Sequence, residues 1–145
     1  MLAQTVTVAP LVSTLVPESE RLQFLPKHFG RLMMLVESRV YTAMRSLCPD
    51  YTGGFWEFYE ISNGAAYLAL RTDATQRMVV EGNGFDGEMG ADAAGIIATL
   101  FALNSVIWQM QHDARAQVSL TEHYYGLQDY GSVHPESALI HRAID

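Results

Sequence analysis

The stretch from Ala93 to Met110 is the longest apolar segment of the sequence and constrains the fold more than any other feature. Asp92 opens it, and apolar residues occupy nearly all of its sides. Its inner face is marked at helical spacing by Ile96, Leu100, Leu103 and Ile107. It is interrupted by Gly95, Thr99, Asn104, Ser105 and Gln109. These interruptions and its length argue against a membrane span. The pattern predicts a central buried helix from Asp92 to about Met110.

Two helices are predicted before this segment. The range 31–47 repeats apolar residues every three or four positions and stops before Pro49, which is typical of an amphipathic helix. Its apolar positions are Met33, Val36, Val40, Met44 and Leu47. Pro17 opens a shorter helix whose first turn carries Glu18 and Glu20, where carboxylates complement the helix dipole. We expect Pro26 to end that helix.

Two more helices are predicted after the central one. The first covers about Ala114 to Asp129 and carries Val118, Tyr125 and Leu127 among polar positions. The second begins at His134-Pro135-Glu136, with the proline at its first position.

Four strand-like segments lie in the middle of the chain: Phe55–Ile61, Ala65–Leu70, Arg77–Glu81 and Phe85–Met89. The turn between the first two contains Asn63-Gly64, which tolerates the positive φ of a tight hairpin. Gly82-Asn83-Gly84 marks a second turn. The predicted fold class is therefore α+β, a small antiparallel sheet packed against several helices in a single compact domain. We expect one domain of residues 1–145, in which residues 1–15 form a flexible arm or an edge strand around the β-branched run Thr5–Val8.

Composition and cysteine content place the chain among globular proteins of a reducing compartment. Its 145 residues fit one domain, and 49% hydrophobic with 17% charged residues excludes a disordered chain. The single cysteine, Cys48, forms no intramolecular disulfide. No secretory signal is predicted, because the first basic residue is Arg21. We expect a cytoplasmic protein without a membrane segment.

The negative charge is concentrated in the C-terminal part. Residues 1–80 hold seven Lys/Arg and seven Asp/Glu, whereas residues 81–145 hold Arg115 and Arg142 against nine acidic residues. The net charge is -7 and the pI is about 5.1. Phosphate backbones need cationic partners, so we expect no direct binding to duplex DNA.

The loop Gly82-Asn83-Gly84-Phe85-Asp86-Gly87 matches the dinucleotide pattern G-x-G-x-x-G. However, Asp86 and Glu88 place carboxylates where a phosphate would lie, and Gly90 delays the following helix. A glycine-rich hairpin turn is the favoured interpretation. The same segment offers oxygen ligands for calcium, but the EF-hand spacing fails at Phe85. We therefore interpret it as a solvated acidic loop.

The sequence contains no set of residues that requires catalysis. The five histidines form no H-E-x-x-H motif and no cysteine–histidine pair, so no zinc site is predicted. They are interpreted as surface or capping residues: His28, His112, His123, His134 and His141. An aromatic group is interpreted as packing rather than base stacking, because Glu57 and Glu60 lie within it. Its members are Tyr51, Phe55, Trp56, Phe58, Tyr59 and Tyr67. No catalytic residue, cofactor or metal is expected.

An ordered set of segments from about residue 16 to the C-terminus resembles the ArdB/KlcA antirestriction family. The segments are Phe24–Gly30, Glu37-x-x-Val40-Tyr41, Leu47-Cys48-Pro49-x-Tyr51-x-Gly53-Gly54-x-Trp56-x-Phe58-Tyr59, Ser62-Asn63-Gly64, Gly82–Phe85 with Gly87-Glu88-Met89, Asp92–Ile96, Ala98–Leu103, His134-Pro135-Glu136 and Arg142–Asp145. The resemblance implies a small α+β protein of mobile genetic elements, including plasmids, that shields incoming DNA from type I restriction-modification enzymes of a bacterial host. It brings no catalytic residue set.

Three hypotheses remain open. The first is an inhibitor that binds a host protein, either the type I restriction complex or a protein that controls it. The second is a short acidic mimic of DNA, although nine carboxylates over 65 residues are sparse beside one phosphate per about 1.7 Å of duplex. The third is an enzyme acting on nucleotides or DNA. For the binders, we predict partner contacts at Glu81, Asp86 and Glu88, which lie close together in sequence and lack a neighbouring Lys or Arg.

Overall fold

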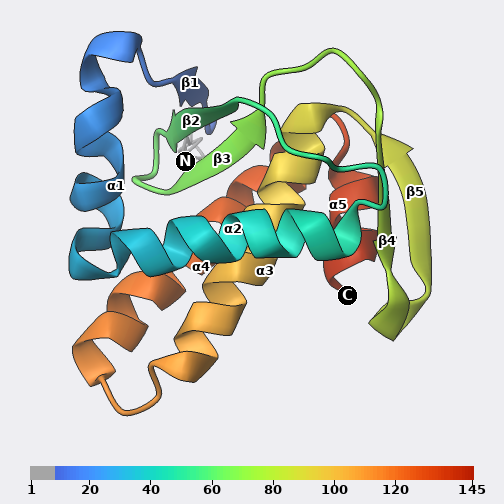
Figure 1. Cartoon of the computed structure of the whole chain (residues 1–145). Coiled ribbons are helices and arrows are strands. Elements are labelled where there is room, and N and C mark those ends of the chain that lie inside the picture. Colours follow the sequence, from blue (N-terminus) through green and yellow to red (C-terminus); the bar gives the residue numbers. More distant parts are fainter. Residues whose placement is uncertain (1–8) are drawn as a thin grey trace, which may run out of the picture.

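The computed structural model describes residues 9–145, which build an α+β domain of helices around one central helix with two small antiparallel sheets (Figure 1). The predicted fold class is confirmed. The elements, in chain order, are β1 (Ser13–Leu15), η1 (Glu18–Glu20), α1 (Arg21–Phe29), η2 (Gly30–Leu32), α2 (Met33–Leu47), β2 (Trp56–Ile61), β3 (Ala66–Leu70), β4 (Gln76–Val80), η3 (Glu81–Asn83), β5 (Phe85–Met89), α3 (Ala91–Gln109), α4 (Ala114–Val133) and α5 (Ser137–Ile144). The strand expected at Thr5–Val8 lies outside the described residues.

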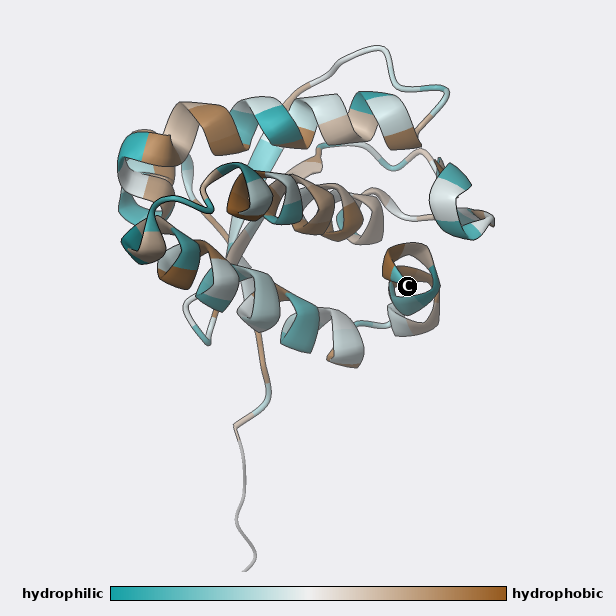
Figure 2. Ribbon diagram, turned by 90° about the horizontal axis from the view of Figure 1, so that it is seen from below, coloured by the Kyte–Doolittle hydropathy of each residue, from teal (hydrophilic) through white to brown (hydrophobic). Residues whose placement is uncertain are grey.

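The helix α3 is the predicted central helix, and its burial is confirmed. Leu100 and Leu103 are buried, while Ile107 is half-buried. Figure 2 shows this strongly hydrophobic ribbon surrounded by other helices. By length and composition alone α3 could cross a membrane, but 61% of its most apolar window is buried inside the protein. Its apolar surface is therefore used to form the core.

Two of the residues that interrupt the apolar stretch, Gly95 and Thr99, fit α3 against β3. The Thr99 hydroxyl accepts a hydrogen bond from the backbone N–H of Leu68 at 3.2 Å. A Cβ added at Gly95 would lie 2.4 Å from the carbonyl oxygen of Leu68. The N–H and C=O of Leu68 point away from β2, toward the free edge of β3. Helix α3 covers this edge, and the Thr99 side chain accepts the hydrogen bond that the Leu68 N–H would otherwise lack.

Two further interruptions, Ser105 and Gln109, bind α2. Arg39 of α2 donates hydrogen bonds to the Ser105 hydroxyl and to the Gln109 side-chain carbonyl. The two acceptors are four residues apart and therefore lie on the same face of the helix. The polar residues of α3 thus join it to its neighbours.

The strands form two separate sheets rather than the single sheet that was predicted. One has the order β1-β2-β3, and the other is the hairpin β4-β5. The first hairpin turns at Asn63-Gly64 as predicted, and Gly64 has a φ of 91°. β4 does not extend the first sheet, because α3 occupies the edge of β3 where a fourth strand would pair.

Several predicted helix ends are corrected. Pro26 does not end the first helix: α1 continues to Phe29, and the chain turns at Gly30, whose φ is 51°. Pro26 cannot donate to the carbonyl of Leu22, but Leu22 is exposed and water can replace that bond. α2 begins at Met33, two residues later than predicted.

The C-terminal helices also differ from their predicted bounds. α4 runs on to Val133, beyond the predicted end at Asp129. α5 begins at Ser137, so Pro135 lies in the preceding turn and not at the first helical position.

Candidate functional site

The predicted contact residues lie together on the β4-β5 hairpin. Glu81 is exposed in the turn, and Asp86 and Glu88 are exposed on β5. Because side chains alternate along a strand, Asp86 and Glu88 point outward while Phe85 and Met89 point into the core. The hairpin therefore presents these three carboxylates to solvent.

The expectation that these carboxylates lack a neighbouring cation is wrong for Asp86. Arg77 of β4 donates to both of its oxygens, from Nε at 3.0 Å and from Nη2 at 2.6 Å. The hydrogen bond from Arg77 holds the pKa of Asp86 below its usual value. Arg77 also faces Glu88 across the ladder. Antiparallel pairing brings these residues together although they are nine or more positions apart in sequence.

The glycine-rich loop is a hairpin turn, as the sequence favoured, and it is fastened to α5. It joins two antiparallel strands and leads into β5, whereas a dinucleotide site requires a helix there. The Asn83 amide donates to the carbonyl of Ala143 at 3.0 Å and accepts from the N–H of Phe85 at 2.9 Å. Asn83 and Asp86 are thus already engaged. Within residues 9–145, no group of three His, Cys, Asp or Glu is placed to hold a metal ion.

Neutralising the hairpin tests its predicted contact role. We expect the triple variant Glu81→Gln, Asp86→Asn and Glu88→Gln to protect incoming DNA less well in cells while keeping nearly the parental melting temperature. Exposed charges at an interface mainly set association rate and salt dependence, so a partial loss is expected. A stable triple variant with full protection would show that the hairpin is only a turn. Arg77→Gln serves as the matched control, since it removes the ion pair and leaves the carboxylates.

A polar cluster joins the start of α3 to the turn before α5. Asp92, in the first turn of α3, accepts from the Tyr67 hydroxyl and from His134 Nε2, both at 2.8 Å. His134 Nδ1 in turn accepts from the N–H of Glu136 at 3.0 Å, which assigns the ring proton to Nε2. The Glu136 carboxylate accepts from the N–H of Gly90. Each group therefore fixes the position of another across three elements.

This cluster contains a histidine–carboxylate pair but has the bonding of a structural joint. The Ser13 hydroxyl bonds to the Tyr67 hydroxyl at 2.9 Å and not to His134. Nucleophilic catalysis needs the hydroxyl within reach of the histidine. Burial raises the pKa of Tyr67, which keeps the phenol protonated as the donor to Asp92. The prediction of a surface position is wrong for His134, whose side chain is 7% exposed. His134 is the C-cap residue of α4, and its ring bonds to the N–H of Glu136 just before α5.

A second cluster joins α1, β2 and α4. His28 Nε2 lies 2.6 Å from Glu60, and His28 Nδ1 lies 3.3 Å from Nε2 of His123. Lys27 also pairs with Glu60 at 2.7 Å, and its hydrogen bond lowers the pKa of Glu60. The His28 side chain is 7% exposed, so the prediction of a surface histidine is wrong here too. Its partners come from distant segments, which sequence spacing does not reveal.

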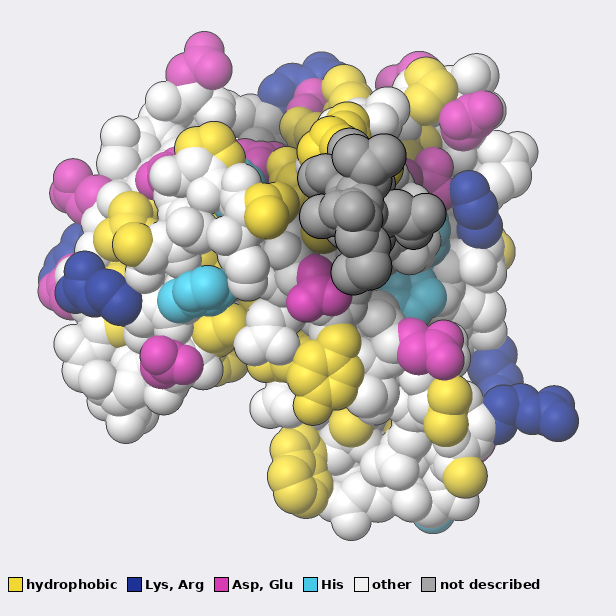
Figure 3. Space-filling model, turned by 180° about the vertical axis from the view of Figure 1, so that it is seen from behind, with side chains coloured by type: hydrophobic (Ala, Val, Ile, Leu, Met, Phe, Trp, Pro, Cys, Tyr) yellow, Lys and Arg dark blue, Asp and Glu magenta, His cyan; other side chains and the backbone are white. Residues whose placement is uncertain are grey.

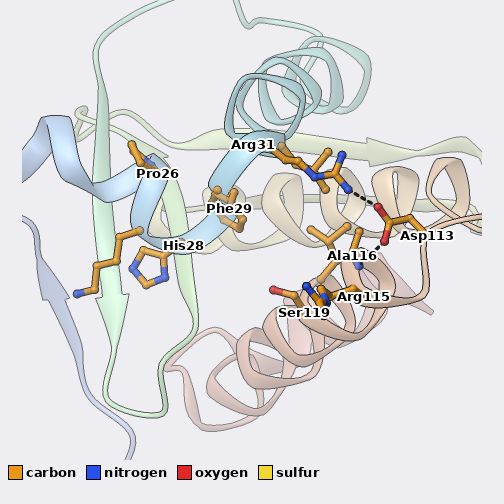
Figure 4. Close-up of a pocket in the computed structure, with 12 residues that line it drawn as sticks. Pro26, His28, Phe29, Arg31, Asp113, Arg115, Ala116 and Ser119 are labelled. Carbon is orange, nitrogen blue, oxygen red and sulfur yellow. Dashed lines mark hydrogen bonds and ion pairs between the residues drawn. The ribbon is translucent and has the colours of Figure 1, made fainter.

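A pocket of about 480 Å³ lies beside this cluster, between the end of α1, η2 and the start of α4 (Figure 4). Asp113 caps α4 by accepting from the N–H of Ala116 at 3.0 Å and also pairs with Arg31. Arg115 adds a further cation to the wall. Lys27 is already paired with Glu60 of β2, and Arg31 is paired with Asp113, so we assign no ligand to this pocket.

The aromatic group packs in the core as predicted, with Phe55 as its exposed member. Trp56, Phe58 and Tyr67 are buried. Arg21 lies 4.7 Å from the Phe55 ring centroid and Arg71 lies 4.6 Å from it. The segment Phe55–Ile61 contains no Lys or Arg of its own. The two arginines that contact Phe55 come from α1 and from the residue after β3. Cys48 is a buried thiol, and burial raises its pKa.

Comparison with known proteins agrees with this architecture. Residues 49–145 match the family model described as "Antirestriction protein". Two relatives from Escherichia coli, each named antirestriction protein KlcA, are 47% and 46% identical over 140 and 137 residues. The matches cover 94% of this chain in both cases and 95% and 96% of the relatives. A solved structure described for the KlcA and ArdB proteins superposes with a TM-score of 0.88 and 44% identity, over 98% of this chain and 100% of that one.

The chain therefore belongs to the antirestriction protein family, and the resemblance carried by its motifs is confirmed. Within that family it is similar to KlcA along nearly its whole length. Members of the family are non-catalytic inhibitors, which agrees with the sequence-based prediction that the protein is not an enzyme.

Proposed function

We propose that the protein protects incoming DNA of mobile elements, such as plasmids, from type I restriction-modification enzymes by binding a host protein, without catalysis. The observation that carries this proposal is the likeness to the KlcA and ArdB structure. Those proteins are described as active against type I DNA restriction systems in vivo but not in vitro. Activity that needs the cell favours a partner beyond the purified restriction enzyme. The partner is then the restriction complex in its cellular setting or a protein that controls it, and the site of action is the cytoplasm.

The charge distribution supports a protein partner over DNA. The C-terminal part carries nine acidic and two basic residues, so it repels a phosphate backbone. Mimicry of DNA is the second candidate, favoured only by this acidity. Against it, Asp86 pairs with Arg77 and Asp113 with Arg31, while Asp92 binds Tyr67 and His134. The carboxylates left free do not form a long array.

Plating tests the proposed function. Unmodified phage is plated on a host with a type I restriction system, with and without the protein. We expect the protein to raise the efficiency of plating, and a host lacking the restriction enzyme to show no change. Equal plating with and without the protein on the restricting host would overturn the proposal.

Purified components separate the two binding routes. We expect no inhibition of a purified type I enzyme at any salt concentration, and no micromolar affinity for duplex DNA or a dinucleotide. The first expectation follows from the activity that the KlcA and ArdB proteins show in vivo but not in vitro. The second follows from the acidic surface and from the hairpin nature of the glycine loop. Direct inhibition that weakens steeply with salt would instead support mimicry, because screening weakens contacts between exposed charges.

A further inference from the structure

The helix α4 presents a continuous stripe of exposed side chains, which we call the α4 stripe. Its members are Val118, Glu122, Tyr125, Asp129 and Val133. They recur every three or four residues, so at 100° per residue they lie within a sector of about 80°. The stripe runs for about 22 Å along the helix. Side chains at this spacing form one face of the helix, and such a face can pack along a second helix.

The folding of the domain does not account for the apolar members of the stripe. Val118, Tyr125 and Val133 are 60%, 59% and 62% exposed, whereas Leu120 and Leu127 are buried on the opposite side of α4. That opposite side packs on α3 and α5. Large apolar residues exposed at regular helical spacing are typical of protein interaction surfaces.

Both charged members of the stripe are acidic. Glu122 and Asp129 alternate with its apolar members, and within residues 9–145 neither forms an ion pair. No Lys or Arg occurs between Arg115, in the first turn of α4, and Arg142. Figure 3, which views the molecule from the side of α4, shows hydrophobic and acidic side chains across the centre of this face and Lys and Arg at its edges.

We propose that the α4 stripe docks an amphipathic helix of a partner protein that carries Lys or Arg beside an apolar seam. A helix repeats its side chains at the spacing of the stripe, so its seam covers Val118, Tyr125 and Val133. Its cations then face Glu122 and Asp129, which gives charge complementarity and selects the orientation. Tyr125 is the expected anchor, because tyrosine often dominates the energy of such interfaces. The inference rests on the proposed function and supplies the surface for it.

A peptide probe tests the stripe directly. The probe is a synthetic helical peptide with leucine at the a and d positions of each heptad and lysine elsewhere, followed by fluorescence anisotropy. We expect the parent protein to bind it, and E122K/D129K to bind about tenfold more weakly or less. The control E18K/E20K changes net charge equally at exposed residues of η1 and should bind as the parent does. Equal losses in the two variants would show attraction by net charge alone and overturn the proposal.

Protection in cells provides the second readout. We expect E122K/D129K and Tyr125→Ser to lose protection while keeping the parental melting temperature, because these side chains are exposed. If the parent protects and both variants protect equally well, the stripe proposal is overturned and the proposed function stands. If the parent itself fails to protect, the proposed function fails and the peptide titration still decides on the stripe. A parent dimer that E122K/D129K converts to a monomer would assign the stripe to a second copy and overturn the proposal.

Discussion

Replacing Gly95 with alanine should destabilise the protein by about 3 kcal/mol or more, because α3 and β3 are too close for a methyl group. An added Cβ would lie 2.4 Å from the carbonyl oxygen of Leu68 and 2.6 Å from the Cβ of Ala69. Neither atom can move by a simple side-chain rotation. Separating the two elements would also break the hydrogen bond from Leu68 to Thr99.

The destabilisation expected for Gly95→Ala is opposite in sign to the usual effect of this substitution in a helix. In an ordinary helix interior, glycine to alanine stabilises by about 1 kcal/mol. Urea unfolding of both proteins measures the difference. Gly82→Ala is the matched control, since a methyl group added there, in the β4-β5 turn, would have no atom within 4 Å and little change is expected. A Gly95→Ala variant as stable as the parent would show that α3 does not contact β3 this closely.

Replacing Leu100 with alanine should cost about 2–5 kcal/mol, the range for a buried leucine removed from a packed core. Leu100 is 1% exposed on α3, where α2, α4 and β3 all pack. The variant is expected to lose antirestriction through loss of fold, because such a cost is a large part of the stability of a domain.

A thermal melt with protection measured in parallel checks this prediction. Met34→Ala is the control, since Met34 is exposed on α2 and its truncation should change stability by less than about 0.5 kcal/mol. If Leu100→Ala melts at the parental temperature, the core is not centred on α3.

Local pattern was sufficient to predict most of the elements. Apolar spacing identified α2 and α3, and Asn63-Gly64 identified the first hairpin, because period and turn chemistry are properties of neighbouring residues. The ordered motifs also indicated the family, which the comparisons confirm. The candidate contact residues on the hairpin came from clustering along the chain, and their role stays a prediction.

The tertiary structure alone decided which residues meet across the chain. Gly95 and Thr99 looked like interruptions of an apolar helix until α3 was placed on the edge of β3. Likewise, Asp86 has no neighbouring cation along the sequence, but β4 places Arg77 beside it. His134 was predicted at the surface, but its ring is buried and bonds to Asp92. The α4 stripe became visible only when burial separated the two faces of α4. The physical reason is that periodicity reports the geometry of one element, whereas charge pairing, close backbone approach and burial depend on the distances between elements.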